Sequence, residues 1–89
     1  MRVGYVLFES TQAAMWAEAV LRREGIGARL VPAPRHLNAP CATALRFEDH
    51  NGLSKAVEAR LTEARVPFVS VRLLEAQPVQ NRKGGQDGS

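Results

Sequence analysis

The chain contains a single cysteine, two histidines and few aromatic residues, and each shortage excludes a class of protein. One cysteine among 89 residues excludes an internal disulfide. His36 and His50 do not stand at zinc-site spacing from Cys41, so no metal or other cofactor is expected. No apolar run approaches the ~20 residues that cross a bilayer, and the first residues lack the apolar segment of a signal peptide. We therefore expect a cytoplasmic domain with no membrane association.

Positive charge is in small excess, and it is scattered along the chain. The formal net charge is +3 at pH 7, whereas a nucleic-acid-binding face needs basic residues clustered together. RNA binding on an RRM-like sheet also needs stacking aromatic residues on the first and third strands. The stretch TALRFED supplies only Phe47. We expect no nucleic-acid partner.

The hydrophobic pattern predicts the element order β-α-β-β-α-β. Ser10 or Thr11 is a suitable cap for the first helix, which ends before Gly25. The strands are predicted at 3–8, 28–31, 43–47 and 68–74, and the helices at about 11–24 and 53–64. LFES precedes the first helix and RFED the second, so the two halves resemble each other. This pattern predicts an α+β, ferredoxin-like split βαβ plait, with two helices on one face of a four-stranded antiparallel sheet. Residues 1–75 are expected to form one domain, and 76–89 a disordered tail with little to bury.

The predicted topology brings the cysteine to the start of the first helix. The first two strands are parallel with the third between them, so the loop that carries Cys41 shares a sheet edge with Ser10 and Thr11. The unpaired N–H groups of a helix start stabilise anions. Thiolates near such groups or near arginine have a lowered pKa, and Arg35 lies close in sequence. The alternative interpretation is an inert thiol packed as a small hydrophobic group.

The first strand is apolar on both of its faces, and only one of these can lie under the helices. Val3, Tyr5 and Leu7 alternate with Gly4, Val6 and Phe8 along this strand. An exposed apolar sheet face in a small domain usually marks a partner surface. We therefore predict a homodimer through the open sheet face, or a docking face for another protein.

Particular motifs between residues 3 and 73 resemble a small bacterial family described as Se/S carrier protein-like. The similar pieces are Phe8-x-Ser10-Thr11, the Val-Pro-x-Pro-Arg segment ending at Arg35, and Cys41 followed by the strand ALRF. Where the family has a serine-rich turn and a glycine after the cysteine, this chain has Asn-Ala-Pro at 38–40 and an alanine at 42.

The resemblance implies that Cys41 carries sulfur or selenium as a persulfide or perselenide. It implies a donor resembling a cysteine desulfurase and an acceptor enzyme. The N–H groups of Ser10 and Thr11 and the charge of Arg35 would then stabilise the anion, with His36 and Arg46 as accessory groups. No acid/base pair accompanies the thiol, so at most a carrier without independent turnover is expected. The alternative is a non-catalytic module of the same fold that binds a small ligand or another protein.

Overall fold

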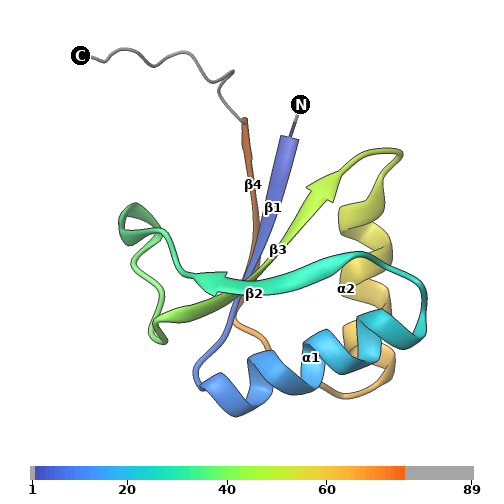
Figure 1. The fold of residues 1–89 in the computed structure, drawn as a ribbon, viewed down its shortest axis with the longest axis horizontal. Coiled ribbons are helices and arrows are strands. Elements are labelled where there is room, and N and C mark those ends of the chain that lie inside the picture. The colour runs from blue at the N-terminus through green and yellow to red at the C-terminus, as the bar shows by residue number, and fades with distance from the viewer. Residues whose placement is uncertain (1, 76–89) are drawn as a thin grey trace.

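The elements of the described chain follow the predicted β-α-β-β-α-β order. The computed structural model describes residues 2–75. Its elements are β1 (Arg2–Leu7), α1 (Thr11–Arg23), β2 (Ala28–Pro32), the short 3-10 helix η1 (Arg35–Leu37), β3 (Thr43–Asp49), α2 (Leu53–Glu63) and β4 (Ser70–Glu75). The strands form one antiparallel sheet in the order β2-β3-β1-β4 (Figure 1). The predicted ferredoxin-like α+β plait is confirmed.

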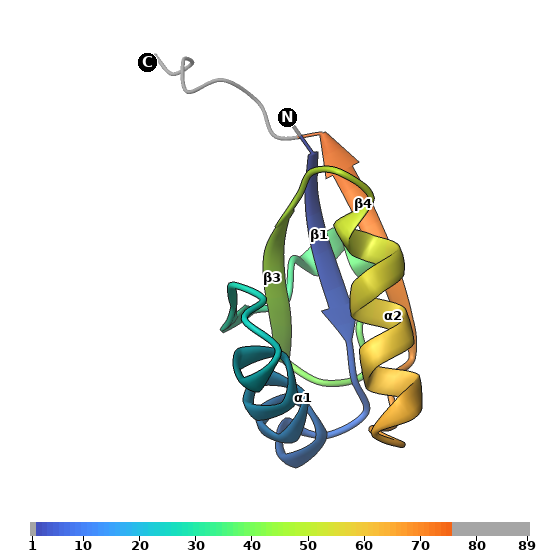
Figure 2. The same ribbon diagram turned by 90° about the vertical axis from the view of Figure 1, so that its right-hand side faces the viewer.

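The main core lies between the sheet and the two helices, which cover the same face (Figure 2). The buried residues of α1 are Ala13, Ala14, Ala17, Val20 and Leu21, and the three alanines allow the helix to lie close to the sheet. The narrower apolar face of α2 buries Val57 and Leu61. The buried residues of this core are Val6, Phe8, Ala13, Ala14, Ala17, Val20, Leu21, Leu45, Phe47, Val57, Leu61 and Val66.

A glycine in β1 makes room for the largest side chain of β3 in this core. Gly4 pairs with Phe47 across the two central strands. A Cβ atom built at Gly4 would overlap the ring of Phe47, so the ring occupies the space that a side chain would fill. This is the close approach for which a strand tolerates glycine.

A second, smaller cluster lies on the sheet face opposite the helices. Leu37 of η1 is buried there against Leu7 of β1 and Ala44 of β3. The connection between β2 and β3 therefore covers part of the face that the sequence predicts to be open. Tyr5 and Leu74 are only partly buried beside this cluster. The homodimer through this face stays a prediction.

Several details of the elements differ from the sequence expectations: β1 spans Arg2–Leu7 instead of 3–8, and β3 continues to Asp49 instead of ending at residue 47. β4 begins at Ser70 rather than at residue 68, because Ser70 pairs with Leu7, the last residue of β1. The stretch between the prolines contains η1, a single 3-10 turn held by the Leu37 N–H to Pro34 carbonyl bond of 3.1 Å. The tail predicted for 76–89 lies outside the described residues.

Candidate functional site

Cys41 stands at the end of the loop formed by residues 33–42, just before β3. The base of this loop is closed by the N–H of Ala33, which donates to the carbonyl of Ala42 at 2.7 Å. Its middle is fixed by Leu37, which packs on the open face of the sheet. Because both points are held, the loop keeps the cysteine at the sheet edge where α1 begins.

Two hydrogen-bonding groups lie against the sulfur atom. The hydroxyl oxygen of Thr11 is 3.4 Å from Cys41 Sγ, and the N–H of Thr43 donates to the same Sγ at 3.4 Å. Thr11 is the first residue of α1, so the sulfur lies beside the amino-terminal end of that helix. Cys41 is half-buried, which leaves the sulfur accessible to a reactant.

These contacts favour the charged form of the sulfur. The pKa of the Cys41 thiol is lowered from its usual value, chiefly by the side-chain hydrogen bond from Thr11 and then by the backbone N–H of Thr43. Partial burial acts in the opposite direction. A thiolate accepts both bonds at once, and groups that hydrogen-bond to the charged form of an acid stabilise it. The arrangement therefore increases the share of nucleophilic thiolate relative to a free cysteine.

The other residues predicted to surround the sulfur occupy different positions. The hydroxyl of Ser10 accepts a hydrogen bond from the N–H of Ala13 at 3.1 Å, so it caps α1. Arg35 and His36 are both exposed on η1. Among residues 2–75 neither side chain forms a hydrogen bond or ion pair with Cys41. The roles of the Ser10 and Thr11 amides and of Arg35 stay predictions.

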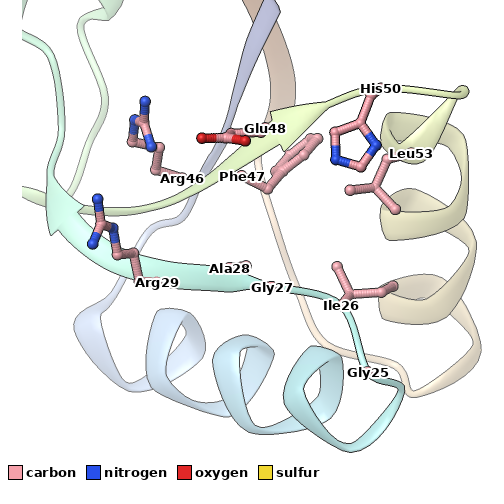
Figure 3. A pocket seen from close by; sticks show the side chains of 10 residues that line it. All are labelled: Gly25, Ile26, Gly27, Ala28, Arg29, Arg46, Phe47, Glu48, His50 and Leu53. Atoms are coloured by element: carbon pink, nitrogen blue, oxygen red, sulfur yellow. The ribbon is translucent and has the colours of Figure 1, made fainter.

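Arg46 lies away from the cysteine, on the face of the sheet opposite the helices. It pairs with Tyr5 on one side and with Arg29 on the other. Arg46 and Arg29 line one end of a hollow of about 610 Å³, whose other end is lined by Ile26, His50 and Leu53 (Figure 3). Cys41 does not line this hollow, so the sulfur site and the hollow are separate features.

Thr43 makes a contact with the sulfur that the sequence did not predict. Its N–H belongs to the residue two positions after Cys41, a spacing at which short polar side chains commonly accept a bond from the backbone. The sequence signal is a Cys-x-Thr step at the start of a strand. Many loops offer such a step, so the pattern alone does not single it out.

No group of metal-binding side chains occurs among residues 2–75. Neither helix in that part of the chain is long and apolar enough to span a membrane.

The chain shows no significant similarity to any curated protein or to any solved structure. One family model does match it, the family described as "Putative Se/S carrier protein-like", and the match covers residues 3–71. That range runs from β1 into β4 and contains Cys41 together with Thr11 and Thr43. The match to the family model thus covers both the plait and the thiol site, and the chain belongs to the Se/S carrier protein-like family.

Proposed function

We propose that Cys41 carries a sulfur or selenium atom, as a persulfide or perselenide, between two partner enzymes. The observation that carries this proposal is the pair of 3.4 Å contacts that Thr11 and Thr43 make with Sγ. A carrier thiol has to be nucleophilic and accessible, and Cys41 has both a lowered pKa and partial exposure. The family to which the chain belongs supports the same assignment.

The transfer is a thiol exchange that needs no added oxidant or reductant. The Cys41 thiolate attacks the outer sulfur of a persulfide on the donor, and a new bond forms between that sulfur and Cys41 Sγ. The sulfur–sulfur bond of the donor breaks, and its electron pair leaves with the donor thiolate. An acceptor thiolate then attacks the same outer sulfur and releases the Cys41 thiolate. Selenium follows the same exchange.

The single cysteine suits this role. A second thiol nearby would attack the inner sulfur of the persulfide and form a disulfide, which would release the cargo. The chain has no other cysteine. A free thiol of this kind persists in a reducing compartment, so we place the carrier in the cytoplasm.

Exposed groups on α1 and on the cysteine loop offer a surface for the donor and the acceptor. Met15 lies one helical turn after Thr11 on the same side of α1, and its side chain is 54% exposed. Trp16 is 47% exposed beside it. Arg35 adds an exposed positive charge on the loop that leads to Cys41. A partner that reaches the sulfur would meet this combination of apolar and basic groups.

Intact mass spectrometry tests the proposal directly. The protein is incubated with a cysteine desulfurase and cysteine, and we expect a mass increase of one sulfur atom. Cys41→Ser is the matched control, because it removes the thiol with little change of volume, and we expect it to gain no mass. The same incubation with selenocysteine in place of cysteine tests whether the protein gains the mass of a selenium atom.

Two results would overturn the assignment. One is the absence of any adduct on the wild-type protein while the desulfurase is active. The other is an adduct of the same size on Cys41→Ser. A non-catalytic binding module, the alternative for this fold, would keep its biological activity in Cys41→Ser, whereas a carrier would lose it.

A further inference from the structure

Three arginines and a tyrosine form one row across the open face of the sheet. In strand order the row is Arg29 of β2, Arg46 of β3, Tyr5 of β1 and Arg72 of β4, each directly paired with the next. Their neighbours along each strand point to the helix side, so strand alternation places the row on the opposite face. Arg29 and Arg72 are exposed, and Arg46 is half-buried.

This row is electrostatically unfavourable within the fold itself. Like charges directly opposite each other on neighbouring strands repel, and Arg29 faces Arg46 in this way. The ion pairs among residues 2–75 involve Arg2, Arg22 and Arg60, and none involves the row. Each guanidinium offers five N–H donors with a geometry that matches carboxylates. The three arginines thus have unused capacity for an anionic ligand.

The surroundings of the row favour a protein rather than a nucleic acid. Glu48 lies on the same face, next to the row (Figure 3), and its carboxylate repels phosphates and carboxylates alike, so it does not decide between the two kinds of ligand. Tyr5 is the only aromatic side chain of the row, whereas single-stranded nucleic acid binds platforms of several stacking groups. The adjoining hollow offers apolar contacts at Ile26 and Leu53, together with Arg29 and Arg46. Apolar contacts beside guanidinium groups are typical of protein interfaces.

We propose that this arginine row, Arg29, Arg46 and Arg72, is the docking surface for an acidic segment of a partner protein. Carboxylates of that segment bind the three guanidinium groups, and an apolar side chain next to them enters the hollow. A second copy of this chain fits less well, because it brings the same row and a net charge of +3.

The row is close enough to the sulfur site for one partner to cover both. Arg46 is five positions after Cys41 in the sequence, about 16 Å of extended chain. An interface of about 800 Å² on each partner has a radius of about 16 Å. Leu37 of the cysteine loop also packs on this face. The identification of the acidic partner as the sulfur donor or acceptor rests on the proposed function. The docking surface itself does not depend on that function.

Binding of a labelled deca-glutamate peptide, followed by fluorescence anisotropy at low ionic strength, tests the surface. One variant replaces the row by glutamines and has the substitutions Arg29→Gln, Arg46→Gln and Arg72→Gln. The matched control removes the same charge from the helices, by Arg22→Gln, Arg23→Gln and Lys55→Gln. We expect the row variant to lose about tenfold in affinity and the control about twofold or less. Amide chemical shifts on titration should change most on β1–β4 near the row.

Each contrary outcome has a distinct meaning. Equal losses in the two variants, or shift changes centred on the helices, would reduce the binding to net charge and overturn the site. Tighter binding of an oligo-uridine through the same residues would overturn the protein partner in favour of RNA. Self-association that the row variant abolishes would assign the face to a second copy.

The carrier proposal is separable in the same experiment. Cys41→Ser should bind deca-glutamate as the wild type does, and the row variant should keep the pH profile of thiol labelling.

Discussion

Replacing Leu37 by alanine tests whether the cysteine loop is held by one buried anchor. Leu37 is 6% exposed, and it packs against Leu7 and Ala44 on the open face of the sheet. Among the described loop residues 33–42, Leu37 is the only buried side chain that packs in this cluster. If the anchor holds the loop, its loss should affect both the stability of the fold and the environment of Cys41.

The size of the effect follows from the position of the leucine. Leucine-to-alanine changes in cores cost about 2–5 kcal/mol, and the cost is smallest where the site can collapse. A surface loop can relax onto the sheet, so we expect the free energy of unfolding to fall by about 2–3 kcal/mol. A domain of this size is stable by only about 4–11 kcal/mol. The loss is therefore large, yet the variant should still fold.

Leu73→Ala is the matched control, because Leu73 is 36% exposed on the edge strand β4. The same truncation there should cost about 1 kcal/mol or less. Urea unfolding followed by circular dichroism measures both variants. Labelling by iodoacetamide as a function of pH then reports the thiol, and the midpoint should move upward in Leu37→Ala because the loop no longer holds Cys41 against Thr11. Equal stability losses in the two variants, with the same labelling midpoint as the wild type, would refute the anchoring role of Leu37.

Two further substitutions test the thiol site and the core. Thr11→Val removes the hydroxyl that contributes most to the lowered pKa of Cys41, so the labelling midpoint should rise toward the usual thiol value, whereas Thr11→Ser should keep it low. The lowered pKa also predicts how stability depends on pH. Because the pKa of Cys41 is lower in the folded than in the unfolded protein, the free energy of unfolding of the wild type should increase as the pH rises from the folded-state pKa to the usual thiol value. Urea unfolding measured across that pH range should show a smaller increase for Thr11→Val. Gly4→Ala forces a Cβ atom into the ring of Phe47, so it should lower the free energy of unfolding by about 1–3 kcal/mol. A thermal midpoint equal to that of the wild type would contradict the packing described for Gly4 and Phe47.

The sequence by itself was sufficient for the architecture. Periods of two and of about 3.6 residues, with Ser10 before the first helix and Gly25 after it, specified six elements in order. Two similar halves in that order leave few arrangements that bury both helix faces, and the ferredoxin-like plait is one of them. The same topology predicted that Cys41 would approach the start of α1, because the parallel course of β1 and β2 puts both at one edge.

Other features depended on contacts between residues far apart in the chain. Leu37 sits in a proline-rich segment without periodicity, and only the fold shows that it covers the open face. The N–H of Thr43 reaches the sulfur because the loop turns there.

Most clearly, Arg29, Arg46 and Arg72 are scattered along the sequence, where they indicate a solvated surface. Strand register alone brings them into one row, since the pairing of β2, β3, β1 and β4 aligns three arginines that lie up to 43 positions apart. Local pattern thus determined which segments are helices and strands, and tertiary pairing decided which charges and which thiol contacts came together.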